Sequence, residues 1–447
     1  MPQDLSQPSK KSASGAVLTI LIIQAALVVT GPLIARMLGP ADRGRYALVI
    51  LVPSVLSQLG VLGLPRSMTY HLATGFDEAS IRARVARREA MLAAGLPFVS
   101  LVFAMALLRE NSAMVIGSAV IASASIPFHV MLQHSLAVLL GRQQYFAHNV
   151  LITLPVIIYA LGIATSFLLG VDTLSGAVIA WVLGFTLGGL AAGAFVRNVP
   201  PRLGGKAIGF GDIATYGRKG LLGTSSPVEQ FRIDQGIAGL VLTHVQLGYY
   251  SVGLAFSNMP RFLGMGVGLL ALPQVAEAQK RGTAVASSAA RRYVLWSALV
   301  CGFAAAGLCA VTPWILPLAF GEEFRAAISV TQWLIVAGAV FGARRTLVEA
   351  AGGMGKPGLA STVEVVALIV LIPAMLIFGQ RFGTVGAGIG LFASAVVSLG
   401  FGLNRLQRIE SEPGDLADSD AELSEMPIKS YSREAQATGY ESAEKPL

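Results

Sequence analysis

Residues 225–240, SSPVEQFRIDQGIAGL, place three charged side chains between two apolar runs of the chain. Glu229, Arg232 and Asp234 fall within six residues, inside a segment that otherwise has the composition of a membrane span. A charged group in hydrocarbon is costly, so such groups face the interior of a helix bundle or a water-filled cavity. The stretch therefore predicts a transmembrane segment that lines a polar interior.

The composition of the whole chain agrees with a membrane protein. Of its 447 residues, 54% are hydrophobic and 13% are charged, about half the charged fraction of a soluble domain. The two cysteines, Cys301 and Cys309, lie in one apolar run and indicate neither a disulfide framework nor a metal site. The basic residues sit mostly between apolar spans, so the net charge of +8 reflects membrane topology and not nucleic-acid binding.

Twelve apolar segments are long enough to cross about 30 Å of hydrocarbon. We place them at 15–36, 46–73, 87–108, 113–140, 146–170, 174–197, 213–243, 247–276, 290–312, 326–351, 358–379 and 384–407. The prediction is an all-α polytopic membrane protein with about 12 transmembrane helices and both termini on one side.

The Lys and Arg residues predict which side holds the termini. With the N-terminus in the cytoplasm, nineteen of them fall in cytoplasmic segments, and the opposite side receives six: Arg36, Arg43, Arg45, Arg109, Arg325 and Arg381. Cytoplasmic loops carry the excess of positive charge in membrane proteins. Both termini are therefore expected in the cytoplasm, and all external loops are short.

An internal repeat divides the spans into two halves. GRYALV at 44–49 matches GYYSVG at 248–253, and LSGAVIA at 174–180 matches TVGAGIG at 384–390, at offsets of 204 and 210. An even number of spans per half gives two lobes of the same orientation, related by an axis along the membrane normal. Such lobes enclose a central cavity that opens to either side by rocking.

The repeat predicts five regions along the chain. Residues 409–447 hold ten acidic and three basic residues without apolar period, which is typical of a disordered tail. We expect a cytoplasmic N-terminus at 1–14, an N-terminal six-helix lobe at 15–200, a cytoplasmic linker at 201–212, a C-terminal six-helix lobe at 213–408 and the acidic cytoplasmic tail.

Two stretches resemble a known family. IARMLGPADRGRYALVILVPSVLSQLGVLGLPRSM at 34–68 is similar to the first-repeat signature of bacterial polysaccharide transporters, and FRIDQGIAGLVLTHVQLGYYSVGLAFS at 231–257 is similar to their R-x-D segment and the G-Y-Y-S-V that follows. These transporters include the O-antigen and exopolysaccharide-repeat flippases of the multidrug/oligosaccharidyl-lipid/polysaccharide (MOP) exporter superfamily. The likeness covers about residues 15–408.

The resemblance implies a flippase of the bacterial cytoplasmic membrane and not an enzyme. It would carry an undecaprenyl-pyrophosphate-linked oligosaccharide from the inner to the outer leaflet by alternating access between two six-helix lobes, for surface or exopolysaccharide synthesis. Expected partners are the bilayer, the lipid-linked oligosaccharide, and a polysaccharide polymerase with its export machinery. No cofactor is expected, whereas Na⁺ or H⁺ coupling is an open expectation.

Ionisable and polar residues inside the spans are the candidate site residues. Arginine suits a pyrophosphate because its planar guanidinium is always charged and binds phosphate oxygens in pairs. The candidates for substrate binding in a central cavity are Arg232, Arg261, Arg66, Arg344, Arg345, His129 and Gln133. Arg232 is the strongest of them, and Gln24 and Gln58 are weaker candidates for sugar contact.

Four carboxylates are candidates either for ion coupling or for salt bridges: Glu229, Asp234, Glu349 and Glu364. Interhelical ion pairs that hold spans together are an equally good interpretation of any single charge. Arg345 and Glu349 are four residues apart and can pair on one helix face. Glu364 departs from the family pattern, which often has Asn or an apolar residue there.

Three other functions remain open, and one is excluded. A multidrug exporter of the same superfamily is the nearest alternative, followed by a membrane scaffold for glycan assembly and by a glycan polymerase or ligase. The last would need a sizeable external loop with acid or base groups, which the short loops do not provide. An ATP-driven pump is excluded because the chain has no G-x-x-x-x-G-K-[ST] motif.

Overall fold

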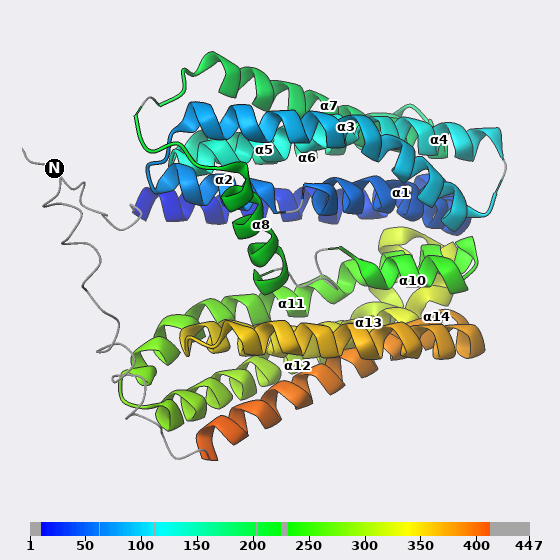
Figure 1. Ribbon diagram of the computed structural model, residues 1–447. Coiled ribbons are helices and arrows are strands. Elements are labelled where there is room, and N and C mark those ends of the chain that lie inside the picture. The colour runs from blue at the N-terminus through cyan, green and yellow to red at the C-terminus, as the bar shows by residue number, and fades with distance from the viewer. Residues whose placement is uncertain (1–9, 62, 111, 203, 225–230, 412–447) are drawn as a thin grey trace, which may run out of the picture.

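The computed structural model describes residues 10–61, 63–110, 112–202, 204–224 and 231–411. All regular elements in these ranges are helices, and Figure 1 shows them in two groups that lie side by side. Helices dominate because a chain in hydrocarbon must satisfy its backbone hydrogen bonds within each segment. The predicted all-α membrane fold with two lobes is confirmed.

The first group holds the N-terminal helices, blue to green in Figure 1. They are α1 (Lys10–Gly60), α2 (Leu64–Ala73), α3 (Glu78–Leu108), α4 (Ala113–Ala124), α5 (Ile126–Gly141), α6 (Tyr145–Leu168) and α7 (Leu174–Asn198).

The second group holds the C-terminal helices, green to red in Figure 1. They are α10 (Ile233–Val241), α11 (His244–Gln279), α12 (Thr283–Phe320), η1 (Glu322–Ala327), α13 (Ile328–Gly353) and α14 (Pro357–Ser411). The helix α8 (Phe210–Thr224) runs between the two groups, across the direction of the other helices (Figure 1).

Eight helical segments of the described chain are long and apolar enough to cross a membrane. Two of them are kinked at a glycine with positive φ, α1 at Gly39 (φ 64°) and α14 at Gly383 (φ 58°). Glycine takes this backbone conformation without a steric penalty. Each kinked helix therefore covers parts of two predicted spans. The helix α11 covers the predicted eighth span, and residues 225–230 of the predicted seventh span lie outside the described chain.

The seventh span differs from its prediction as one helix over 213–243. The structure has α8 in its first half and the short α10 at its end, residues 225–230 lie outside the described chain, and Arg232 directly before α10 has a left-handed backbone (φ 45°, ψ 46°). An unbroken helix would carry Arg232 and Asp234 on a fixed surface through hydrocarbon, whereas a break lets both side chains turn to the interior. Arg232 lies one nine-residue helix, about 14 Å, from the far end of the span.

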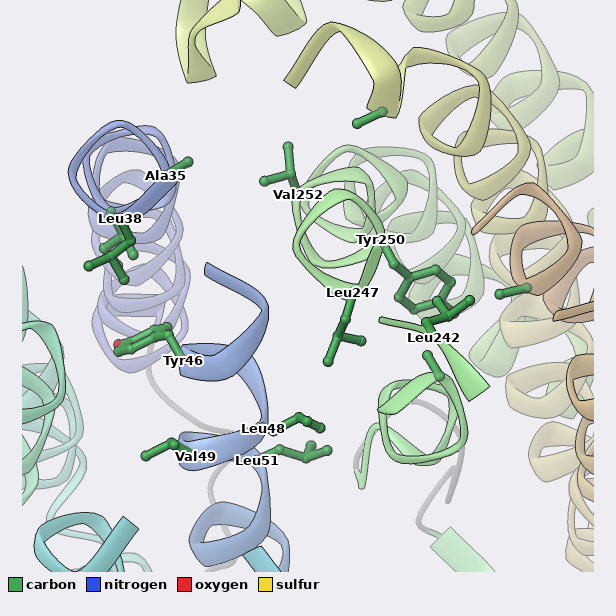
Figure 2. Packing of buried hydrophobic residues seen from close by; sticks show 14 of the residues in the cluster. Ala35, Leu38, Tyr46, Leu48, Val49, Leu51, Leu242, Leu247, Tyr250 and Val252 are labelled. Atoms are coloured by element: carbon green, nitrogen blue, oxygen red, sulfur yellow. The ribbon is translucent and has the colours of Figure 1, made fainter. Parts of the chain in front are cut away.

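The two lobes share a hydrophobic core at one end and have separate cores at the other. The shared core includes Leu48 of α1 and Leu247 of α11, and Figure 2 shows Leu48 and Leu51 on the side of α1 that faces Leu242 and Leu247. Separate cores form around Met68 in the first lobe and around α12 and the end of α14 in the second.

The start of α1 and the end of α14 lie at the same end of the molecule, away from the shared core (Figure 1). The prediction that both termini are on one side is therefore confirmed for the described chain. The cytoplasmic assignment of that side stays a prediction from the positive charges.

Candidate functional site

Two glycines of the internal repeat make the closest contact between the lobes. A Cβ atom on Gly44 would collide with the carbonyl oxygen of His244, and a Cβ atom on Gly248 would collide with the carbonyl oxygen of Pro40. Each glycine thus meets the carbonyl that lies four residues before the other glycine. The contact has pseudo-twofold symmetry, and it closes the space between the lobes at the end away from the termini.

From this closed end, α1 and α11 diverge and line one cavity of about 420 Å³ between the lobes. Four pairs of lining residues keep the repeat offset of 204: Ala47 and Ser251, Ile50 and Leu254, Leu51 and Ala255, Ser54 and Asn258. The second part of α1 and the first part of α11 are therefore equivalent walls. The internal repeat, which is weak in the sequence, therefore corresponds to two equivalent helices that line one cavity.

Three arginines reach this cavity from three elements: Arg43 from α1, Arg232 from the start of α10 and Arg261 from α11. Arg43 and Arg261 are half-buried, and Arg232 is exposed to the cavity. Among the described lining residues, Asp234 is the one carboxylate that faces these three cations. The cavity is consequently positive and suited to an anion.

The arginines lie close enough to influence one another. Arg232 interacts electrostatically with Arg43, Arg261 and Asp234. Its left-handed backbone is uncommon for a residue with a side chain and costs about 1–3 kcal/mol. Like charges and backbone strain both oppose folding, and such arrangements concentrate at binding sites.

Fixed hydrogen bonds surround the arginines. The hydroxyl of Tyr250 donates to a carboxylate oxygen of Asp234 at 3.0 Å, which holds this carboxylate against α11. On the opposite wall, the hydroxyls of Tyr46 and Tyr159 are 2.8 Å apart, and the guanidinium of Arg43 lies 5.6 Å from the ring centre of Tyr46. Arg43 and Arg261 each keep one buried Nε atom without a hydrogen-bond partner in the described chain. These groups leave donors for a ligand.

The other predicted substrate-binding residues lie elsewhere. Arg66 is exposed on α2, and Gln133 donates to the backbone oxygen of Ser57 at 3.4 Å. His129 is buried behind the cavity wall, where its ring stacks on that of Phe185 with centroids 4.0 Å apart. Of the two weaker candidates, Gln58 lines the cavity and Gln24 does not.

The remaining charged candidates form ion pairs inside the C-terminal lobe. Arg344, 1% exposed, donates to Glu364 of α14 at 3.1 Å. Arg345 and Glu349 pair at 2.8 Å, which confirms the predicted contact four residues apart. Glu229 lies outside the described residues. Substrate contact by these arginines and ion coupling by these carboxylates stay predictions.

Arg43 is the cavity residue that the sequence did not reveal. The positive-charge count assigns it to an external loop, because it precedes the second span. In the structure, the kink at Gly39 starts the second part of α1 early, and Arg43 points between the lobes. The sequence offered one signal for this position, because Arg43 directly precedes Gly44, the first residue of the internal repeat.

The described residues contain no group of three or more His, Cys, Asp or Glu side chains that could hold a metal ion. The chemistry of the site is therefore that of guanidinium groups, one carboxylate, and neutral polar and aromatic side chains. Such a lining is suited to an anionic ligand.

Comparison with known proteins agrees with this geometry. A family model described as polysaccharide biosynthesis protein matches residues 33–329. No curated protein sequence matches the chain.

Solved structures of low sequence identity share the fold. A structure of the lipid II flippase MurJ in an inward closed conformation aligns with a TM-score of 0.72 at 12% identity, over 88% of this chain and 89% of that one. An inward-facing multidrug resistance MATE family transporter of the MOP superfamily aligns with a TM-score of 0.64 at 15% identity, over 89% and 96%. A crystal structure of MATE in the straight conformation gives 0.55 at 14% identity, over 89% and 97%.

Proposed function

The chain belongs to the polysaccharide biosynthesis protein family, and on this premise we propose that it is a flippase for a lipid-linked oligosaccharide. Its substrate would be an undecaprenyl-pyrophosphate-linked repeat unit, moved from the inner to the outer leaflet of the bacterial cytoplasmic membrane. The fold that it shares with MOP superfamily transporters supports transport as the general activity.

The positive cavity between the lobes is the observation that carries this proposal. A pyrophosphate loses much of its hydration on entering a membrane interior, and that loss is costly unless fixed charges replace the water. Arg43, Arg232 and Arg261 supply those charges from both lobes. A ligand held between them would be passed across the membrane when the lobes part at the contact of Gly44 and Gly248 and close at the other end.

The same charges separate this proposal from its nearest alternative. An exporter of cationic drugs would have to bind its substrate beside three arginines and one carboxylate. The repulsion by the three arginines exceeds the attraction by the single carboxylate. A glycan polymerase or ligase, and a scaffold without transport, would not need an anion-binding cavity between lobes. Drug hypersensitivity of a deletion strain with normal surface glycan would favour the drug exporter.

The driving ion is a separate proposal. Asp234 is the carboxylate nearest the cavity arginines, so binding of Na⁺ or H⁺ there would change the charge that a substrate meets. Transport into vesicles with an imposed Na⁺ or H⁺ gradient distinguishes the two ions from transport without coupling.

Our first prediction concerns the three arginines. Arg232→Ala, Arg261→Ala and Arg43→Ala should each lower glycan export at least about tenfold, because a lost charge-assisted hydrogen bond costs about 1.5–3 kcal/mol. The measurement is surface polysaccharide together with the lipid-linked oligosaccharide that accumulates inside the cell. Arg325→Ala is the matched control, since Arg325 pairs with Glu322 on an exposed surface.

Normal surface polysaccharide in the Arg232 and Arg261 variants, at normal protein amount, would refute the proposal. Loss of polysaccharide without accumulated lipid-linked oligosaccharide would also contradict it, because a blocked flippase leaves its substrate inside.

A further inference from the structure

Arg36 crosses between the lobes at the closed end of the cavity. It lies on the first part of α1, and its Nε atom donates to the backbone oxygen of Ala319 at 2.9 Å. Its Nη2 atom donates to the backbone oxygen of Leu318. Both acceptors are in the last turn of α12, where helix carbonyls lack partners within the helix. Arg36 of one lobe therefore caps a helix of the other lobe.

A second polar contact joins the lobes at the same end. Arg45 holds the Glu110 carboxylate through two hydrogen bonds of 2.8 and 2.6 Å. The Oε1 atom that accepts from Arg45 Nη2 also lies 3.6 Å from Nδ1 of His244, at the start of α11. Asp42 binds the far side of Arg45 at 2.6 Å. Asp42, Arg45, Glu110 and His244 therefore form a row of polar contacts. Its last member, His244, is the residue whose carbonyl oxygen meets Gly44.

The contacts of Arg36 with α12 and of Glu110 with His244 differ from the glycine contact in how they respond when the lobes part. The glycines allow the helix backbones to approach, but they have no side chain to hold them there. Arg36 and Glu110 are accessible to water, so their groups can be rehydrated at modest cost when the lobes part. Contacts of this strength can hold a state and still release it in each cycle.

We propose that Arg36 and Glu110 are positioning residues that hold the lobes together at the end away from the termini. This inference rests on the proposed function in one respect, that the lobes rock during transport. Arg36 acts on the end of α12, and Glu110 acts on the start of α11. Neither touches the cavity arginines, so both act on the equilibrium between conformations and not on substrate binding.

The test measures access to the cavity through the closed end, without any substrate. Both native cysteines are replaced by alanine, and Ala255→Cys in the cavity wall reports access to a membrane-impermeant maleimide added to intact cells. Asp172→Cys, in the exposed loop between α6 and α7, checks that the reagent reaches this side. Gly44→Ala is the positive control, because its Cβ atom prevents close approach.

We expect Arg36→Ala and Glu110→Gln to raise the labelling rate of Ala255→Cys about three- to tenfold. Arg36→Lys should give an intermediate rate, because it keeps the charge but loses the paired donors. Arg325→Ala removes an exposed ion pair within one lobe and should leave the rate unchanged. Membrane abundance and melting profiles identify a variant that fails to fold, in which case the other variant carries the test.

Equal rates for Arg36→Ala, Glu110→Gln and Arg325→Ala, with Asp172→Cys fully labelled, would overturn the inference. The result is separable from the proposed function, since glycan export is measured in different strains. If the gate exists but the protein does not export glycan, labelling rises in the variants and glycan export is unaffected by loss of the protein. If the protein exports glycan but lacks this gate, labelling stays unchanged and loss of the protein stops glycan export.

Discussion

At the scale of single residues, charge is the property that gives this protein its site. Arg43, Arg232 and Arg261 lie around one cavity with Asp234 as their nearby carboxylate. In the C-terminal lobe, Arg344 and Arg345 are each paired with a glutamate on the same or the next helix. Paired charges stabilise contacts between helices, and the cavity arginines keep capacity to bind a ligand.

Glu110 gives a prediction about pH. Its hydrogen bonds to Arg45, more than the charge of Arg45 or His244, lower the pKa of this carboxyl below its ordinary value. Arg45 lies in the same lobe as Glu110, so the part of this lowering that depends on closure comes from His244 of the other lobe. A carboxylate that gains this partner on closure stabilises the closed contact above its ordinary pKa and loses the effect as the pH falls through the lowered value. Asp42, Arg45 and His244 are the charged or titratable groups that face this contact.

We therefore expect labelling of Ala255→Cys to stay slow from neutral pH down to the ordinary carboxyl range, about pH 4, and to rise below it. Glu110→Gln should show fast labelling throughout and no such rise. The measurement is the labelling rate against external pH, corrected by the rate of Asp172→Cys. A change in rate near pH 6.5, about the ordinary range of histidine, with no rise in the carboxyl range would assign the effect to His244 instead.

Residues also show where sequence reasoning succeeds. Arg232 and Arg261 were predicted to lie in a cavity, because a charged side chain far from the ends of a span must face the bundle interior or a water-filled cavity. Arg43 was missed because it precedes a span by only a few residues, and sequence spacing does not tell an external loop from an inward turn. The kink at Gly39 makes that choice.

At the scale of elements, α1 and α11 are the pair that defines the site. Their repeat glycines meet at the closed end, and their equivalent faces line the cavity below it. Close approach through small residues is a common way for helices to pack in membranes. The same pair therefore provides both the closed end and the walls of the cavity.

The pseudo-twofold symmetry makes a prediction for this pair. Gly248→Ala should block closure as Gly44→Ala does, because each added Cβ atom meets a backbone carbonyl that cannot rotate away. Labelling of Ala255→Cys should rise in both variants by a similar factor, about tenfold or more. Gly266→Ala on the same helix has open space around its Cβ position and is the control. An effect of Gly44→Ala alone would show that the two contacts are not equivalent.

The seventh span shows the limit of prediction at this scale. Its apolar residues predicted one helix, but its charges are compatible with hydrocarbon only if the helix is interrupted. In the described chain, the backbone leaves the helical conformation at Arg232, directly before α10 begins at Ile233. Hydropathy averages over a window and cannot show such a break.

At the scale of the molecule, the described structure is closed at one end and divided at the other. A shared hydrophobic core joins the lobes near the repeat glycines, and separate cores lie toward the termini. Burial of apolar surface between lobes favours closure at the joined end. We therefore expect a ligand to enter the cavity from the side of the termini.

The side of the membrane that this end faces is our last prediction. The nineteen basic residues counted on the side of the N-terminus place both termini in the cytoplasm. A fluorescent protein fused to the C-terminus should fluoresce, and alkaline phosphatase inserted in the loop at Asp172 should be active. Inactive phosphatase at Asp172 together with active phosphatase at the C-terminus would reverse the orientation.

The sequence by itself determined that this protein is a helical membrane protein with two repeated lobes and charges in its interior. Hydropathy, the repeat and the cost of buried charge are local or additive properties, so they can be read without coordinates. Only the tertiary structure decided that Arg43 joins Arg232 and Arg261, that Arg344 is paired with Glu364, and that Gly44 meets Gly248. These relations depend on how helices far apart in the chain turn and approach, which is set by packing between lobes.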